Sequence, residues 1–274
     1  MRITVAHSPD SDDAFMFAAL ALGRIDAGPY EFVHVLEDIE TLNRKARDGV
    51  YEVTAFSIHA FAHLAGRYAL LNQGASMGEG YGPRIVALAD LPDLAGQRVA
   101  TPGEWTSAHL ALRLFAPRAV PVPMDFDRIF FAVRSGEVEA GVVIHEGQLT
   151  FAAEGFRLLA DLGVWWRGET GLPLPLGGNG VRRDLGERVM ADLARLLRES
   201  IAWGLSNREE ALDHALRYGR GLTREQADRF VSMYVNERTL DYGEDGRRAV
   251  REFLDRAFRA GLVPHPVEPD FLGA

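Results

Sequence analysis

One histidine of this sequence stands where a side chain tends to emerge into a ligand-binding cleft. His145 comes directly after Ala140–Ile144, a short apolar run rich in β-branched residues that predicts a buried strand. A neutral imidazole accepts a proton near pH 7, which makes histidine the commonest general base. A histidine whose ring is satisfied by backbone groups at a strand end fits the same position. We take His145 as the candidate catalytic base and keep this structural reading open beside it.

Three hydroxyl side chains stand where a helix is expected to begin. Ser57 precedes one helix, and Thr106 and Ser107 open another. The first N–H groups of a helix have no intrahelical acceptor and, together with the helix dipole, attract negative charge. Hydroxyls beside them can bind a carboxylate without a lysine, although helix capping explains each residue singly. Because the two helix starts fall in different lobes of the expected fold, we favour a shared carboxylate site.

The polar segment after the first expected strand supplies secondary candidates. His7 ends that strand, and Ser8 and Asp13 follow it at the start of the first helix. Asp12 and Asp13 could act as an acid/base pair. Acidic residues in the first turn of a helix also offset its dipole, and on the sequence alone this second reading is favoured.

No metal or cofactor site is expected. His59 and His63 are four residues apart, but the glutamate of a His-Glu-x-x-His zinc site is missing and no third ligand is evident. The glycine-rich stretch Gly74–Gly82 matches neither a Walker A loop nor a dinucleotide fingerprint, and we expect a loop there. The absence of cysteine excludes thiol catalysis and thiolate metal sites.

These candidates need a scaffold, and the sequence predicts an α/β fold with mixed, largely parallel sheets. Short apolar runs alternate with segments of helical period, the pattern of strands joined by crossover helices. The expected strands cover residues 3–6, 30–35, 53–56, 84–89, 97–101, 120–122 and 140–144. Helices are expected over 12–22, 39–46, 58–64, 106–115 and 126–134, and from 185 to 261 with caps at Asn207 and Thr223.

The alternation restarts near residue 95, which predicts a second lobe inserted into the first. We expect residues 1–94 and 176–274 to form a larger, discontinuous lobe and residues 95–175 a smaller one, with the Pro/Gly-rich stretch 172–180 as the return crossing. In open α/β sheets ligands bind beyond the carboxyl ends of strands. This rule places Ser8–Asp13, Ala55–Ser57, Thr106–Ser107 and His145 beside one cleft between the lobes.

Composition narrows the functional class. The 274 residues carry a formal net charge of −9, which argues against nucleic-acid or anionic-membrane binding. No run approaches the ~20 apolar residues of a membrane span. The start Met1–His7 runs straight into a polar segment rather than a signal-peptide core, so we expect a cytoplasmic protein. The expected partner is a small anionic molecule, and the sequence leaves the number of subunits open.

A set of motifs resembles the 1,4-dihydroxy-6-naphthoate synthases of the futalosine route to menaquinone. The resemblance runs over nearly the whole chain and includes its length. The matching motifs are His7-Ser-Pro-Asp-Ser-Asp-Asp-Ala-Phe15, Glu37-Asp-Ile-Glu-Thr-Leu-Asn43, Thr54-Ala-Phe-Ser-Ile-His-Ala60, Gly136-Glu-Val-Glu-Ala-Gly-Val-Val-Ile-His-Glu146, Thr170-Gly-Leu-Pro-Leu-Pro-Leu-Gly177 and Arg182-Arg-Asp-Leu-Gly186.

The resemblance implies a two-lobed fold of the periplasmic-binding-protein type II class and an aromatic, anionic substrate. It implies a lyase that needs no cofactor and cleaves cyclic dehypoxanthine futalosine into the dihydroxynaphthoate and dihydroxyacetone, with His145 as proton acceptor. Some relatives carry lysine where this chain has Ala55, so a role for that ammonium is lost here. The substrate contacts implied are Ala55, Phe56, Ser57, Thr106 and Ser107, with Leu176 and Gly177 as further candidates.

Two other functions remain open at this point. A chorismate dehydratase of the same pathway has a similar fold, but lacks the combination of the His7-Ser-Pro-Asp and Ile-His-Glu motifs. A non-catalytic small-anion-binding protein has the same architecture, but the sequence start lacks the signal and the lipid-attachment cysteine of a transporter component. Assays with each substrate separate these functions.

Overall fold

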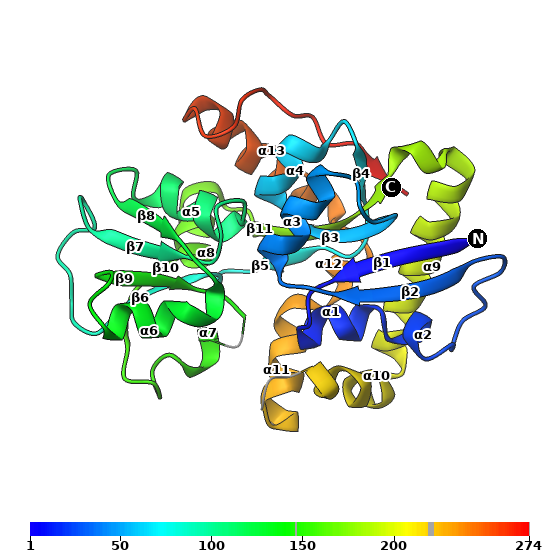
Figure 1. The fold of residues 1–274 in the computed structure, drawn as a ribbon, viewed down its shortest axis with the longest axis horizontal. Coiled ribbons are helices and arrows are strands. Elements are labelled where there is room, and N and C mark those ends of the chain that lie inside the picture. The colour runs from blue at the N-terminus through cyan, green and yellow to red at the C-terminus, as the bar shows by residue number, and fades with distance from the viewer. Residues whose placement is uncertain (146, 219–221, 274) are drawn as a thin grey trace.

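Two β-sheets, each with its own helices, lie side by side in the computed structural model, which describes residues 1–145, 147–218 and 222–273. Figure 1 shows the larger sheet with its helices on the right and the smaller on the left, joined by two extended segments. We call these two parts the larger and the smaller lobe. No helix among the described residues has the length and apolar character needed to cross a membrane.

The larger sheet is mixed and is built around buried strands from both ends of the chain. Its order is β12-β4-β11-β3-β1-β2, with β5 paired to β11. β1 is parallel to β2 and β3, whereas β11 returns from the smaller lobe and is therefore antiparallel to β3, β4 and β5. The strands are β1 (Arg2–His7), β2 (Glu31–Leu36), β3 (Val53–Ser57), β4 (Tyr68–Leu71), β5 (Ser76–Gly78), β11 (Leu174–Arg182) and β12 (Phe271–Leu272).

The smaller sheet has the order β10-β6-β9-β7-β8. β7 is parallel to β8 and β9, while β6 is antiparallel to both of its neighbours. The strands are β6 (Arg84–Ala87), β7 (Arg98–Thr101), β8 (Val120–Pro123), β9 (Ala140–Val143) and β10 (Arg157–Asp161).

The first lobe boundary differs from the one that the sequence predicted. A boundary between residues 94 and 95 leaves β6 in the larger lobe, but β6 pairs with β9 and β10. The chain therefore enters the smaller sheet before Arg84. The predicted boundary was placed where the strand–helix alternation restarts. It misses β6 because a loop, not a helix, follows that strand. The division of the chain into two lobes stays our proposal, with its first crossing moved to residues 79–83.

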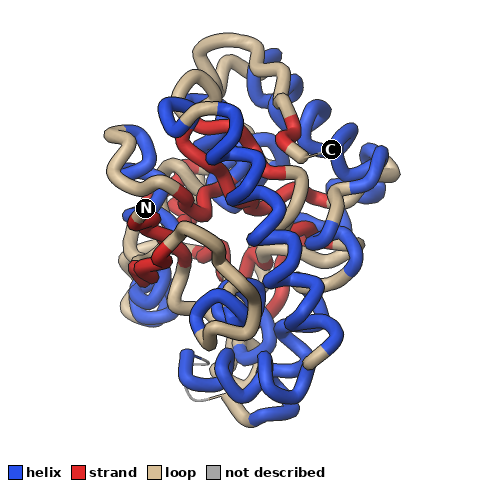
Figure 2. Tube along the Cα trace, turned by 90° about the vertical axis from the view of Figure 1, so that its right-hand side faces the viewer, coloured by secondary structure: helices blue, strands red, loops and turns tan. Residues whose placement is uncertain are grey.

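Helices cover both faces of the larger sheet, as the view along the long axis shows in Figure 2. Their apolar positions form separate cores with the strands: one includes Phe15, Val5 and Leu197, and another includes Phe61 and Phe253. Thr223 caps one helix in a reciprocal capping box with Gln226, as expected from the sequence. The helices are α1 (Ser11–Met16), α2 (Ala18–Ala21), α3 (Ile39–Arg47), α4 (Ile58–Leu64), α9 (Glu187–Ser206), α10 (Arg208–Ala215), α11 (Arg224–Tyr234), α12 (Glu237–Leu240) and α13 (Gly243–Arg259), with 3₁₀ turns at Arg183–Leu185 and Leu216–Tyr218.

Four helices accompany the smaller sheet: α5 (Ser107–Phe115), α6 (Ile129–Arg134), α7 (Gly147–Thr150) and α8 (Leu162–Thr170), with a 3₁₀ turn at Phe126–Arg128. The indole of Trp166 is fully buried and donates to the carbonyl of Pro173, 3.0 Å away. Gly163 lets α8 approach the first crossing, since a Cβ at this position would lie 2.0 Å from the carbonyl oxygen of Tyr81. The two lobes therefore meet through close backbone contact at the crossing.

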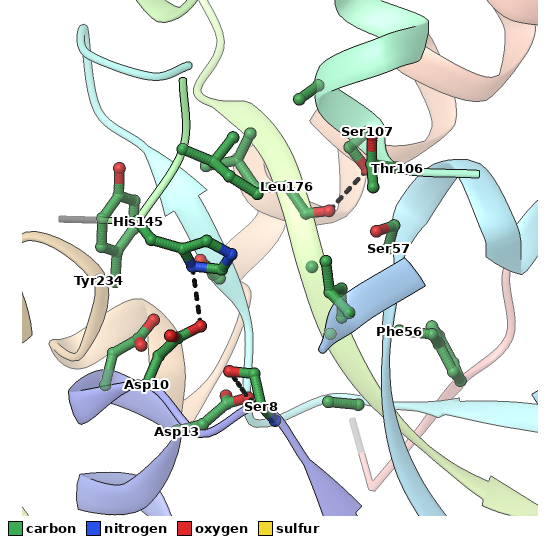
Figure 3. A pocket seen from close by; sticks show the side chains of 18 of the residues that line it. Ser8, Asp10, Asp13, Phe56, Ser57, Thr106, Ser107, His145, Leu176 and Tyr234 are labelled. Atoms are coloured by element: carbon green, nitrogen blue, oxygen red, sulfur yellow. Dashed lines mark hydrogen bonds and ion pairs between the residues drawn. The ribbon is translucent and has the colours of Figure 1, made fainter. Parts of the chain in front are cut away.

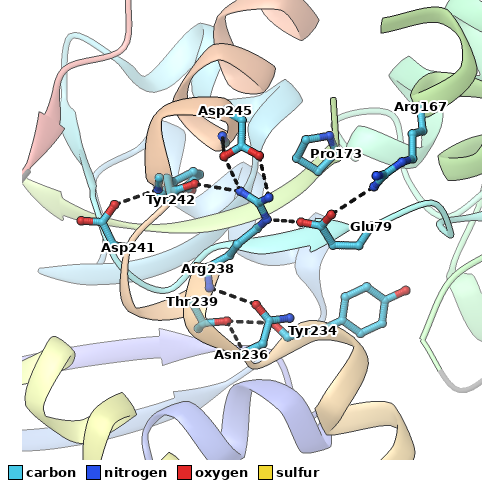
Figure 4. Close-up of polar contacts among 12 residues, drawn as sticks. Glu79, Arg167, Pro173, Tyr234, Asn236, Arg238, Thr239, Asp241, Tyr242 and Asp245 are labelled. Atoms are coloured by element: carbon cyan, nitrogen blue, oxygen red, sulfur yellow. Dashed lines mark hydrogen bonds and ion pairs between the residues drawn. The ribbon is translucent and has the colours of Figure 1, made fainter. Parts of the chain in front are cut away.

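An ion-pair network joins the first crossing to both lobes (Figure 4). Glu79 pairs with Arg238 of the larger lobe and with Arg167 of the smaller lobe, the latter at 3.3 Å. The second carboxylate on Arg238 is Asp245, at 2.6 Å to each of two guanidinium nitrogens. A bidentate pair has fixed geometry, so Arg238 is held in one orientation beside the crossing.

Candidate active site

A cavity lies between the lobes, at the carboxyl ends of the central strands of both sheets (Figure 3). It holds about 740 Å³ of empty space, its open mouth included. The lining comes from nine chain segments: Ser8, Asp10, Asp12 and Asp13; Ile39; Ala55–Ser57; Gly74 and Ser76; Pro83; Thr106–Ala108; Ile144, His145 and Gln148; Leu176–Asn179; and Phe230 and Tyr234 of α11.

His145 lies between β9 and α7, with an unusual backbone conformation. Its φ is +54°, the one positive value among the described non-glycine residues. This left-handed conformation costs most residues about 1 kcal/mol or more, and such conformations cluster at functional sites. Glu146, the last residue of the Ile-His-Glu motif, lies outside the described residues.

The ring of His145 is held by a carboxylate of the other lobe. His145 Nδ1 lies 2.7 Å from Oδ2 of Asp10, and the two side chains are 15% and 2% exposed. The ring of Phe126 packs edge-on against the imidazole at 4.8 Å. Because Asp10 accepts the proton on Nδ1, the neutral ring has its lone pair on Nε2. The geometry thus suits His145 to take a proton at Nε2.

The segment between β1 and α1 carries a second carboxyl group, Asp13. Its Oδ2 accepts hydrogen bonds from the backbone N–H and the hydroxyl of Ser8, both at 2.8 Å. Burial raises the pKa of Asp13 to about 6, and the charge of Asp10 adds to the rise, while the bonds from Ser8 and the charge of His145 oppose it. Asp10 and Asp13 therefore have different chemical surroundings although they lie three residues apart.

The opposite side of the cavity is lined by hydroxyls without charge. Asn43 binds Ser57 twice: its Oδ1 accepts from the Ser57 N–H at 2.8 Å and its Nδ2 donates to the hydroxyl at 3.1 Å. The hydroxyl of Thr106 accepts from the N–H of His109 at 3.2 Å and so caps α5. The expected free N–H at Ser57 is therefore already used, because Asn43 reaches it from α3.

The start of α5 keeps N–H groups directed at the cavity. Ser107 and Ala108 occupy the first turn, where helix geometry offers no intrahelical acceptor. The hydroxyl of Ser107 joins the lobes, since it donates to the carbonyl of Leu176 at 2.6 Å and accepts from the N–H of His59 at 3.2 Å. Among the described lining residues none is lysine or arginine, so a bound anion relies on N–H and O–H groups here.

Most of the residues singled out in the sequence come together around this cavity. His145, Ser8, Asp13, Ala55, Ser57, Thr106, Ser107, Leu176 and Gly177 all line it. The side chain of Phe56 points away and stacks on Phe61 at 5.7 Å, so Phe56 offers its backbone. His59 and His63 face each other with ring centroids 6.1 Å apart, and His59 Nδ1 lies 3.3 Å from the carbonyl of Thr106.

His7 does not belong to the cavity lining that the described residues form. Its ring stacks on Phe17 at 4.7 Å, and its Nε2 lies 3.3 Å from Nδ1 of His34. Burial lowers the pKa of His7 to about 4. The secondary candidate His7 is therefore not placed at the site, because its ring turns toward Phe17 and His34, while the loop after β1 reaches the cavity.

Several polar lining residues were not among the site residues taken from the sequence, including Asp10, Gln148, Asn179 and Tyr234. Asp10 stands in the same motif as Asp13, but nothing in the sequence shows that it meets His145. Gln148 and Tyr234 bridge the lobes, with the tyrosine hydroxyl donating to Oε1 of Gln148 at 2.9 Å. Asn179 lies opposite Ala55 across β11 and β3. Each of these roles depends on contacts between distant segments.

Comparison with known proteins identifies the family of the chain. A family model described as menaquinone biosynthesis matches residues 3–259. A 1,4-dihydroxy-6-naphthoate synthase from Thermus thermophilus is 42% identical over 270 residues, which cover 98% of this chain and 99% of the relative.

Solved structures show the fold of the chain. A crystal structure of an Archaeoglobus fulgidus protein is 48% identical, with a TM-score of 0.92 over 96% of this chain and 98% of that chain. An alkanesulfonate-binding protein from Xanthomonas axonopodis pathovar citri, bound to MOPS, is 14% identical, with a TM-score of 0.72 over 97% of this chain and 96% of that chain. This last likeness confirms the predicted periplasmic-binding-protein type of fold. The chain therefore belongs to the menaquinone-biosynthesis family that contains the 1,4-dihydroxy-6-naphthoate synthases.

Proposed function

We propose that this protein is a carbon–carbon lyase that cleaves cyclic dehypoxanthine futalosine into 1,4-dihydroxy-6-naphthoate and dihydroxyacetone. The observation that carries the proposal is the pair formed by His145 and Asp10 at the wall of the cavity, 2.7 Å apart. Such a pair prepares a neutral imidazole to accept a proton. Family membership supports the dihydroxynaphthoate product, because a relative aligned over 98% of this chain carries the synthase name. The substrate and the dihydroxyacetone fragment are those that the resemblance of the motifs implies.

The two sides of the cavity favour one orientation of an aromatic acid. Asp10 and Asp13 lie on the His145 side (Figure 3), and the negative charge of Asp10 repels the substrate's own carboxylate. The hydroxyl of Ser57 and the N–H groups at the start of α5 attract it. The carboxylate thus binds at the α5 side, and the carbons to be cleaved lie toward His145.

The reaction needs orientation, proton removal and exclusion of water. Loss of one proton to Nε2 of His145 allows the three-carbon fragment to leave while the remaining ring becomes aromatic, and aromatisation supplies driving force. Holding the substrate against a positioned base lowers the entropic cost of the step. Residues of the cavity walls provide both the base and the orientation of the substrate.

Closure of the lobes brings Asp10 against His145 and so orients the proposed base. His145 and Gln148 belong to the smaller lobe, whereas Asp10 and Tyr234 belong to the larger lobe. The contacts His145–Asp10 and Tyr234–Gln148 therefore exist when the lobes are together. Closure over a substrate excludes water and orients the imidazole in the same movement.

The proposed reaction is tested by product analysis. Purified protein is incubated separately with cyclic dehypoxanthine futalosine and with chorismate, and products are identified by mass spectrometry. We expect the dihydroxynaphthoate and dihydroxyacetone from the first substrate and no change in the second. Dehydration of chorismate indicates the sister enzyme instead, and tight binding of the first substrate without turnover indicates a binding protein.

Ser57→Ala is expected to raise KM about tenfold with a smaller change in kcat. A hydrogen bond to a charged group contributes about 1.5–3 kcal/mol, and this one acts on a carboxylate that takes no part in the chemistry. Steady-state kinetics measure both constants. Ser200→Ala is the matched control, because its buried hydroxyl binds the carbonyl of Met16 in the larger lobe's core. An unchanged KM in Ser57→Ala contradicts the carboxylate site.

A further inference from the structure

Asp13 faces the same cavity as His145 and has one carboxyl oxygen left for a ligand. Both hydrogen bonds from Ser8 end on Oδ2. Among the contacts of the described residues, none is made to Oδ1, although Asp13 lines the cavity. The two hydrogen bonds from Ser8 therefore hold the carboxyl group at the cavity wall, and neither of them uses Oδ1 (Figure 3).

The surroundings of Asp13 favour its protonated form more than those of an ordinary aspartate. Burial is the largest cause of a pKa near 6, and the neighbouring charge of Asp10 acts in the same direction. The other titratable groups around the cavity are Asp12 of the same helix, His145 of the smaller lobe and Tyr234 of α11. An anionic substrate in this cavity raises the pKa of Asp13 further, because it disfavours a second negative charge.

We propose that Asp13 is the catalytic acid that works opposite the base His145. This assignment rests on the lyase function proposed above. Two titratable groups whose environments differ in one cavity commonly divide the acid and base roles. In its neutral form His145 accepts a proton at Nε2, and in its protonated form Asp13 donates one from the oxygen that Ser8 leaves unbound.

The proposed step conserves protons and electron pairs. Nε2 of His145 takes one proton from the substrate, and the electron pair of that bond forms a carbonyl on the departing three-carbon fragment. The carbon–carbon bond breaks, and its pair passes into the ring system and onto a ring oxygen. That oxygen takes the proton of Asp13 and becomes a hydroxyl of the aromatic product. The imidazolium and the carboxylate then exchange one proton with solvent, which restores both groups.

The sign of the pH dependence follows from the acid role. A general acid works in its protonated form, so kcat falls as pH rises through the pKa of Asp13 in the substrate complex. For the wild-type enzyme we expect this alkaline limb at or above pH 6. Asp13→Asn keeps an oxygen for Ser8 but has no acidic proton. We expect it to lower kcat about 100-fold and to remove the alkaline limb.

Two further variants separate chemistry from structure. Ser8→Ala removes a hydrogen bond that lowers the pKa of Asp13, so we expect the limb to move to higher pH. Asp13→Glu keeps a carboxylic acid and is expected to restore the limb and part of the rate. Asp192→Asn, on the far side of the larger lobe beside Tyr30, is the control with a wild-type profile.

The experiment is the pH profile of kcat for dihydroxynaphthoate formation by the wild-type enzyme and these variants. Loss of the alkaline limb in Asp13→Asn supports the acid role. An intact alkaline limb in this variant overturns it, whatever the value of kcat. If Asp13→Asn does not fold, the pH profile of Ser8→Ala tests the proposal instead. A shift of its alkaline limb to higher pH supports the proposal, and an unchanged limb overturns it. A wild-type enzyme that makes no product contradicts the lyase function, whereas wild-type turnover with an intact limb in Asp13→Asn contradicts Asp13 alone.

Discussion

His145→Ala is expected to lower kcat by about 10²–10⁴-fold, the range that a positioned general base contributes. The reason is geometric: Asp10 lies 2.7 Å from Nδ1 of the imidazole, which leaves Nε2 as the nitrogen that can accept the substrate's proton. Alanine keeps the polypeptide but leaves nothing at this position to accept the proton. Single-turnover and steady-state rates of dihydroxynaphthoate formation measure the loss.

The left-handed backbone of His145 calls for a matched variant. Alanine at φ +54° carries a cost of about 1 kcal/mol or more, whereas asparagine tolerates this conformation better. His145→Asn is therefore expected to keep the wild-type melting temperature and to lose the same activity. His265→Asn, at an exposed histidine, controls for the substitution itself. A His145→Asn enzyme with near wild-type kcat removes His145 from the mechanism.

Asp10→Asn is expected to have the second largest effect, a loss in kcat of about 10²–10⁴-fold. The carboxylate of Asp10 accepts the Nδ1 proton of His145, but an asparagine amide can turn its N–H₂ toward Nδ1. The imidazole then carries its proton on Nε2, which can no longer act as a base. In serine proteases the same replacement of the aspartate behind a catalytic histidine costs about 10⁴-fold. Kinetics at saturating substrate measure the change.

The changes in kcat and KM distinguish the role of Asp10 from that of the residues that bind the substrate's carboxylate. Asp10→Asn acts on the base, so kcat falls while KM stays within a few-fold of the wild-type value. Ser57→Ala produces the opposite pattern. An Asp10→Asn enzyme with raised KM and unchanged kcat means that Asp10 binds substrate rather than orienting His145.

Much of the scaffold could be predicted from the sequence because local patterns determine it. β1 and β3 are short β-branched runs, and both are followed by polar residues that open a helix. The carboxyl ends of such strands meet at one edge of a sheet. This rule alone brought Ser57, Thr106 and His145 to a common cleft, where the cavity is found.

Elements without a distinctive local pattern were not predicted. β4 is the four-residue run Tyr-Ala-Leu-Leu, whose length and composition fit a helix or a strand. β5 lies inside the glycine-rich stretch expected to be a loop, and it forms through pairing with β11. The expected helix over residues 12–22 is interrupted at Phe17, between α1 and α2. In each case tertiary pairing or packing outweighs local propensity.

The partners of the candidate residues could not be predicted for a related reason. Asp10 and His145 are 135 positions apart and belong to different lobes. Asn43 takes both polar groups of Ser57 from a neighbouring helix. Sequence spacing identifies residue types that can do chemistry, but it does not show which distant side chain orients them.

The most direct test of the central claim is the protonation of the His145 ring, measured by ¹⁵N NMR of histidine-labelled protein. The signals of His145 are assigned by their loss in His145→Asn. At the pH of turnover, we expect a neutral His145 ring with the proton on Nδ1 and none on Nε2. A proton on Nε2 with a bare Nδ1, or a doubly protonated ring throughout the active pH range, contradicts His145 as the base.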